Sequence, residues 1–203
     1  MKKTIIAAIA LAMMLLCSCG EKDYVDLGLS VKWAKCNIGA ALPQEAGEYI
    51  TWGGLETQER YSRDDYKFAG EEDGTATKYN AADGLTRLES CDDVATVRLG
   101  DGWRMPTNAE FEELVDKCTF EWCEVEGVTG AKFTAENGNW IFFPAVGSSF
   151  ASFEPTIGSD VRVWSGEIKD EDTGTHLYIT SSRARPGSGA VRYIGYSIRP
   201  VHE

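Results

Sequence analysis

The clearest pattern of hydrophobic and polar positions lies between residues 107 and 118. Apolar side chains recur there at the spacing of one helical face, at Phe111, Leu114, Val115 and Cys118. Thr107 followed by Glu110 is a capping box, in which the two side chains accept hydrogen bonds from backbone N–H groups that have no partner within the helix. The pattern predicts an amphipathic helix that begins at Thr107. A shorter helix is predicted after Asp92-Asp93, with an aspartate as its N-cap and Val94 and Val97 in its first turns.

Strand patterns dominate the rest of the chain. We expect one or two short strands within residues 24–34, and further strands at 48–52, 120–125, 131–135, 140–144, 161–164, 176–180 and 191–201. Asn137-Gly138 predicts a type I′ hairpin turn, because both residues tolerate positive φ. Residues 55–90 are polar and aperiodic, and residues 145–160, 167–175 and 181–190 are predicted loops. The order of elements predicts an α+β fold with two early helices and a mostly antiparallel, loop-rich C-terminal sheet.

The N-terminus has the pattern of a targeting segment. Lys2 and Lys3 precede an apolar run at residues 4–16 that is too short to span a membrane, which predicts a signal peptide over residues 1–18. Leu16-Cys17-Ser18-Cys19 resembles a bacterial lipobox, so Cys19 is the predicted lipidated residue, followed by a short tether over residues 19–23 and one domain over residues 24–203. The alternative is an ordinary cleaved signal. The acidic residues after Cys19 favour the outer face of the outer membrane over the periplasmic face.

Charge and cysteine content narrow the classes of partner. The 203 residues carry a net charge of −12, which argues against nucleic acid, since nucleic-acid binding requires a basic surface. Binding to an anionic membrane surface also requires basic residues, so the lipid anchor is the only membrane contact that we expect. Four cysteines follow the anchor, namely Cys36, Cys91, Cys118 and Cys123. They allow three disulfide connectivities, although a buried free thiol is the simpler interpretation for Cys118 on the helical stripe.

Several segments together resemble a known family. Residues 24–34, Asn37-Ile38-Gly39-Ala40, Gly102-Trp103-Arg104-Met105-Pro106-Thr107 and Ser197-Ile198-Arg199-Pro200-Val201 follow one another as in the Fibrobacter succinogenes major paralogous domain family, which is abundant among lipoproteins of Bacteroides-like bacteria. The resemblance covers nearly the whole mature chain. It implies a C-type-lectin-like fold in the branch related to formylglycine-generating enzyme, with a binding surface near the C-terminus. A structural role is predicted for Trp103, Arg104, Pro106, Thr107 and Arg199 in its most specific motifs, and for Glu110 in the capping box. Arg104 and Arg199 are interpreted as ion-pair or carbonyl-binding arginines.

The metal-binding motifs of the related proteins are incomplete in this chain. Calcium-dependent lectins of this fold place oxygen ligands in Glu-Pro-Asn and Trp-Asn-Asp motifs, whereas this chain has Glu154-Pro155-Thr156 and Trp164-Ser165-Gly166. The acidic runs Glu71-Glu72-Asp73 and Asp170-Glu171-Asp172 carry oxygen ligands that suit calcium, although such runs are typical of solvated loops. No other cofactor is expected. The copper-binding cysteine pair of the related enzymes has no counterpart, because no cysteine follows Cys123. We therefore expect a protein that is not an enzyme.

A ligand-binding surface is the remaining interpretation. Aromatic and arginine side chains are enriched at interfaces, and the late loops carry several of them. The candidate ligand-binding residues are Phe150, Phe153, Glu154, Asp160, Trp164, Arg183, Arg185 and Tyr193. For Trp164, a position in the core is an equally good interpretation. The predicted function is a cell-surface lipoprotein that binds a glycan or a protein; an extracellular enzyme and a structural envelope protein are the alternatives.

Overall fold

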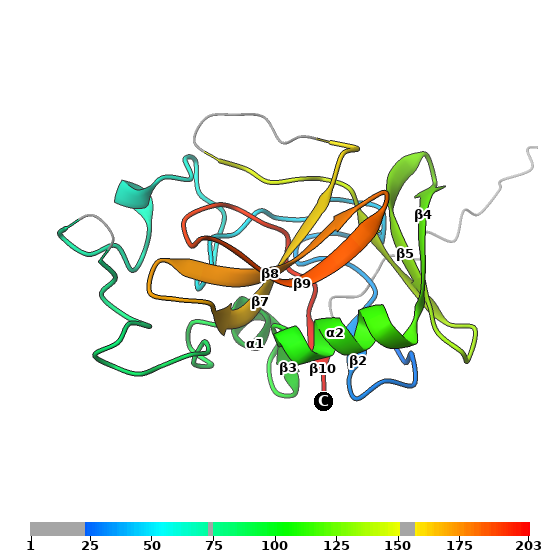
Figure 1. Ribbon diagram of the computed structural model, residues 1–203, viewed down its shortest axis with the longest axis horizontal. Coiled ribbons are helices and arrows are strands. Elements are labelled where there is room, and N and C mark those ends of the chain that lie inside the picture. Colours follow the sequence, from blue (N-terminus) through cyan, green and yellow to red (C-terminus); the bar gives the residue numbers. More distant parts are fainter. Residues whose placement is uncertain (1–22, 73–74, 151–156) are drawn as a thin grey trace, which may run out of the picture.

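The computed structural model describes residues 23–72, 75–150 and 157–203. Figure 1 shows two short α-helices among antiparallel strands and long connections. The helical elements are η1 (Arg63–Asp65), α1 (Val94–Leu99) and α2 (Asn108–Lys117). The strands are β1 (Tyr24–Val25), β2 (Lys32–Ala34), β3 (Trp103–Arg104), β4 (Thr119–Val125), β5 (Val128–Thr134), β6 (Trp140–Pro144), β7 (Val161–Ile168), β8 (Thr173–Thr180), β9 (Arg183–Val191) and β10 (Val201–His202). No helix in these ranges is long and apolar enough to cross a membrane.

The strands form three antiparallel sheets within the described residues. Their strand orders are β1-β2-β10-β3, β4-β5-β6 and β7-β8-β9. The first sheet pairs the beginning of the domain with its end, because β10 lies between β2 and β3. The predicted arrangement of two helices with mostly antiparallel strands is therefore confirmed.

Both helix starts follow the sequence prediction. The Thr107 hydroxyl accepts a hydrogen bond from Glu110 N at 3.2 Å, and the Glu110 carboxylate accepts one from Thr107 N at 2.8 Å. Arg104 also donates hydrogen bonds to this carboxylate from both terminal nitrogens, at 2.9 and 2.6 Å. At α1, Asp93 is the N-cap and accepts from Ala95 N and Thr96 N. The turn that leads into α2 is thus held by charge as well as by capping.

Two hydrophobic cores lie on either side of the β7-β8-β9 sheet. The first joins α2, the β4-β5-β6 sheet and one face of β7 and β8, through residues such as Phe111, Leu114, Phe133, Val163 and Leu177. The second joins α1 to the segments before and after it, and it includes Trp52, Tyr79, Trp103, Trp164 and Tyr196. Figure 1 shows α2 beside β8 and β9, on the side of the first core.

Arg199 belongs to the scaffold between these cores. Its side chain is completely buried and donates four hydrogen bonds: to Asn37 Oδ1, and to the carbonyls of Ala34, Lys35 and Phe142, over 2.9–3.2 Å. Arg199 therefore joins the end of β2 and the residue after it to β6. Of the two structural roles considered for these arginines, Arg199 binds backbone carbonyls and Arg104 pairs with the Glu110 carboxylate.

Three predicted backbone features differ from the structure. Residues 48–52 form no strand. The backbone N–H groups of Ile50 and Trp52 donate to the carbonyls of Tyr196 and Arg192, and these donors are two residues apart whereas the acceptors are four apart, so the ladder is interrupted. Residues 191–201 are not one strand either, since Gly195, Tyr196 and Ser197 bridge to three different segments. Conversely, the predicted loop at 181–190 is mostly strand, because β8 offers β9 a complete ladder of partners.

The type I′ turn is also displaced from its predicted place. Glu126 and Gly127 have φ of 49° and 81° between the paired residues Val125 and Val128, which is the two-residue hairpin geometry. At the predicted site only Gly138 has positive φ, at 84°, and five residues separate the Thr134–Trp140 pair. A loop of that length accommodates a single left-handed glycine, so the prediction for Asn137 was wrong.

The cysteines do not form the disulfides considered from the sequence. Cys91, Cys118 and Cys123 are free thiols, so none of the pairings among them and Cys36 occurs. Cys118 is buried in the first core, and this burial raises the pKa of its thiol. Its predicted role as a packed thiol is confirmed.

Candidate functional site

The outer face of the β7-β8-β9 sheet, opposite α2, carries a row of polar side chains. Arg162 pairs across the sheet with Tyr178, which pairs with Arg185, and the next pair is Thr180 with Arg183. Neighbouring residues of a strand point to opposite faces, and Ala184 packs against the first core. Arg183 and Arg185 therefore point outward, and both are exposed. We call these five residues, Arg162, Tyr178, Thr180, Arg183 and Arg185, the arginine face.

Arg162 is held in a fixed position on this face. Its guanidinium lies 5.2 Å from the Tyr178 ring centroid and 5.8 Å from that of Tyr196. Asp160 accepts from Arg162 Nε at 2.9 Å and from Nη2 at 3.3 Å. Burial opposes the charge of this guanidinium, but the hydrogen bonds to Asp160 and Tyr196 outweigh it and raise the pKa of Arg162. The result is a permanent, oriented cation with an aromatic ring on its surface side.

Arg183 and Arg185 differ from Arg162 in having no counter-charge. Within residues 23–72, 75–150 and 157–203, no carboxylate forms an ion pair with either one. Their strand lies at the edge of the sheet, so solvent reaches both guanidinium groups. An arginine with all five donors free presents a planar fork that matches carboxylate, sulfate or phosphate oxygens.

The other end of the same outer face is covered. Trp164 and His176 pair across β7 and β8 and are 0% and 4% exposed. The Trp164 indole donates to the carbonyl of Ile50 at 3.0 Å, and Trp52 donates in return to the carbonyl of Ser165 at 3.0 Å. Trp164 is therefore a core residue, and its candidate role in ligand contact was wrong. The apolar cover excludes a ligand from this end of the face.

His176 is an uncharged member of the covered end. Its ring packs against Trp164 at 5.8 Å and Tyr196 at 4.9 Å between centroids. Burial, helped by the nearby charge of Arg162, lowers the pKa of His176 to about 4. Its Nδ1 has no hydrogen-bond partner within the described residues. At neutral pH the side chain is thus a packing group rather than a proton donor or a cation.

The remaining candidate residues fall into separate places. Phe150 is 41% exposed and stacks on Tyr193 with centroids 6.2 Å apart, where the bridge from Ser149 to Gly195 joins their segments. Asp160 is buried and serves as the partner of Arg162. Phe153 and Glu154 lie outside the described residues. The structure thus joins Phe150 to Tyr193, and it places Arg183 and Arg185 with Arg162, which the sequence analysis had not selected.

Arg162 and Tyr178 had a recognisable signal in the sequence. Each stands between two β-branched or leucine residues of a strand, in Val161-Arg162-Val163 and Leu177-Tyr178-Ile179. This alternation indicates that both side chains point to the face opposite the core. The cross-strand pairing that brings them together depends on the register of β7 and β8, which the local pattern does not give.

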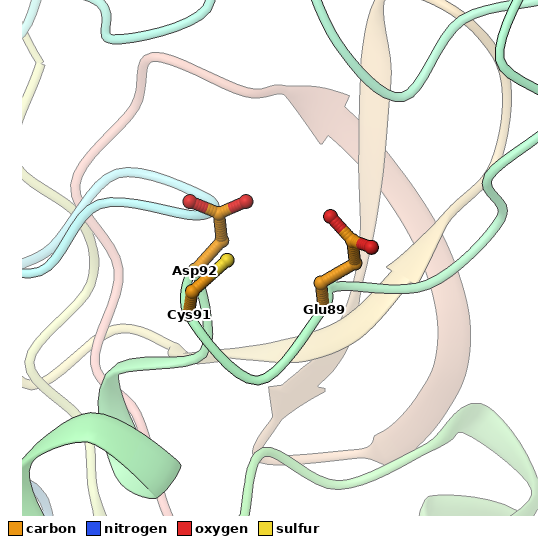
Figure 2. Close-up of side chains that lie close together, drawn as sticks. All are labelled: Glu89, Cys91 and Asp92. Atoms are coloured by element: carbon orange, nitrogen blue, oxygen red, sulfur yellow. The ribbon is translucent and has the colours of Figure 1, made fainter.

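A second cluster combines three potential metal ligands. Figure 2 shows Glu89, Cys91 and Asp92 rising from the turn that precedes α1, with Glu89 opposite the other two. Their ligand atoms lie within 4.8 Å of one another. The Asp92 carboxylate, however, already accepts from Lys67 and Lys78 Nζ at 2.5 Å each and from the Tyr79 hydroxyl at 2.6 Å. Burial would raise its pKa, yet these donors lower it to about 2. A cation here would have to displace two ammonium groups, so we interpret the cluster as a structural network.

The acidic loop after β7 is likewise engaged with backbone. Asp170 Oδ1 accepts from Asp172 N and Thr173 N at 3.1 and 2.8 Å, and Glu171 accepts from Ala81 N at 3.1 Å. A pocket of about 420 Å³ opens beside it, where Arg192 donates to the carbonyls of Lys78, Tyr79 and Asp170. These contacts fix the loop against the segment before α1. Of the other acidic run considered for calcium, Asp73 lies outside the described residues.

Comparisons with known proteins add no identity to this geometry. No family model, no curated protein and no solved structure matches the chain.

Proposed function

We propose that this protein is a lipid-anchored protein of the bacterial outer membrane, exposed at the cell surface, whose domain binds a glycan or a protein ligand without catalysis. The arginine face is the proposed contact surface. The domain is proposed to have a C-type-lectin-like fold. In support, α1 and α2 precede the antiparallel sheets β4-β5-β6 and β7-β8-β9 along the chain, which agrees with what the sequence motifs imply.

One observation carries the binding proposal. Two exposed arginines without counter-charge stand beside an arginine that is locked by Asp160 and two tyrosine rings. Exposed arginines gain little from folding, since a solvated cation makes no favourable contact in the folded protein. A row that combines an oriented guanidinium, an aromatic ring and two free guanidinium groups has the composition of a recognition surface.

The anchor proposal rests on the sequence. Cys19 lies three residues after an apolar run at residues 4–16, in a lipobox-like context, and Glu21 and Asp23 follow it. Lipidation of Cys19 with more than one acyl chain would hold the domain at the membrane, because one chain alone gives only reversible binding. Mass spectrometry of the protein from the membrane fraction should detect the lipid on Cys19. The variant Cys19→Ala should be released from the membrane fraction.

The binding proposal is tested with the full-length protein in a neutral detergent. It is applied to a glycan array, with and without Ca²⁺, and to surface proteins captured from host and bacterial cells. The variant Arg183→Gln/Arg185→Gln should weaken the ligand found by about tenfold or more, because charge-assisted hydrogen bonds are lost. The melting temperature should stay unchanged.

A matched control removes the same charge elsewhere. Arg60 and Arg87 are exposed and lie outside the arginine face, and Arg60 pairs with Asp65 at 2.9 Å. Arg60→Gln/Arg87→Gln therefore removes two positive charges without changing the proposed surface, and it should bind as the wild type does. If both double variants weakened binding equally, a general charge effect would replace the proposed surface. An empty array together with an empty capture would remove the binding proposal.

A further inference from the structure

We infer that the ligand of the arginine face is an acidic polysaccharide, one whose sugar units carry carboxylate or sulfate groups. This inference rests on the proposed function and specifies its ligand class. It follows from the charge of the face, the spacing of its cations and the shape of its edge strand.

Charge distinguishes this face from the protein as a whole. The chain carries a net charge of −12, while the three arginines of the arginine face are balanced by one carboxylate, that of Asp160 beside Arg162. The open part of the sheet therefore presents about two unbalanced positive charges on an acidic molecule. Complementary potentials select partners, and a like-charged ligand would be repelled here. A neutral glycan would leave both free guanidinium groups without a matching group.

The spacing of the cations suits an extended, repeating anion. Arg183 and Arg185 are two residues apart on one face of a strand, so their Cα atoms are separated by roughly 7 Å along the strand. Arg162 lies two strands away on the same row, with Tyr178 between it and Arg185. A flat polymer with acidic groups at intervals can contact several of these guanidinium groups at once, and a sugar ring can lie on the tyrosine between them.

The edge strand is shaped against a peptide partner. Extended peptides join a sheet by pairing with the free backbone of an edge strand. Pro186 removes an N–H from β9, and Gly187 has φ of 69° where the register with β8 shifts between His176 and Tyr178. Proline and bulges on an edge are devices that prevent strand addition. The side chains of the face, rather than its edge, are therefore left for recognition.

The experiment measures binding of the full-length protein to four immobilised polymers: polygalacturonate, which carries carboxylates; dextran sulfate, which carries sulfates; neutral dextran; and polyglutamate, an acidic polypeptide. We expect binding to polygalacturonate or dextran sulfate at least tenfold tighter than to dextran or polyglutamate. Arg183→Gln/Arg185→Gln should lose about tenfold to hundredfold of this affinity, and Arg60→Gln/Arg87→Gln should lose none.

Comparison of the two acidic polysaccharides shows whether the arginine face prefers carboxylate or sulfate groups. Equal binding of neutral dextran would overturn the inference while leaving the proposed binding surface intact. Preference for polyglutamate would overturn it in favour of an acidic protein partner. Binding of an acidic polysaccharide that both double variants retain would also overturn it, because the contact would then lie elsewhere.

Discussion

The two faces of the β7-β8-β9 sheet are built from alternate residues of the same strands, yet they have opposite roles. The inner face consists of Val161, Val163, Leu177 and Ile179, each buried in the first core. The outer face carries Arg162, Tyr178, Arg183 and Arg185 at the intervening positions. Burial of an apolar side chain stabilises the fold, whereas an exposed cation contributes little to it. The difference indicates that selection for stability explains one face and not the other.

The largest expected effect is a comparison of two neighbouring residues. Leu177→Ala should lower the free energy of unfolding by about 2–5 kcal/mol, because it removes buried methyl groups and leaves a cavity in the first core. Tyr178→Ala should cost about 1 kcal/mol, mainly the contact of its ring with the Arg162 cation. Urea denaturation at neutral pH measures both. Equal losses would show that the outer face is packed as tightly as the core.

Some of this division was predictable from the sequence. The alternation in residues 161–164 and 176–180 gives β7 and β8, and the capping box gives α2, because both signals are local. β9 was missed since Arg183–Val191 is rich in glycine and serine and lacks apolar alternation; it is a strand because β8 supplies its hydrogen-bond partners. The burial of Trp164 depends on Ile50, which is distant in the chain. A local sequence pattern reflects only the residues of its own segment. The strand β9 and the burial of Trp164 depend on contacts with other segments, so the local pattern did not predict them.

His176 offers the next largest effect, because it lies on the outer face but in its covered part. Its ordinary pKa is 6.5, and burial lowers the pKa to about 4 in the folded protein. Between these values the unfolded chain binds a proton that the folded protein does not. The stabilisation is therefore complete above pH 6.5 and is lost as the pH falls to 4, by about 3 kcal/mol.

A substitution at His176 tests this slope directly. His176→Gln should flatten the loss of unfolding free energy between about pH 6.5 and 4, measured by urea denaturation at several pH values. An unchanged slope in His176→Gln would mean that water reaches the covered end, and the boundary between covered and open surface would have to be redrawn.

The smallest expected effect concerns salt and separates the arginine face from the acidic surface around it. Binding of a polyanion releases counterions in proportion to the cations it contacts, and Arg183 and Arg185 supply two free ones. Between roughly 50 and 200 mM salt, affinity for an acidic polysaccharide should fall by about tenfold or less. Arg185→Gln should reduce the slope of log affinity against log salt by about one unit at most, and Arg60→Gln should leave it unchanged. An affinity that rises with salt would show that repulsion by the net charge of −12 outweighs the attraction of the local arginines. The outer face would then act as part of the acidic surface.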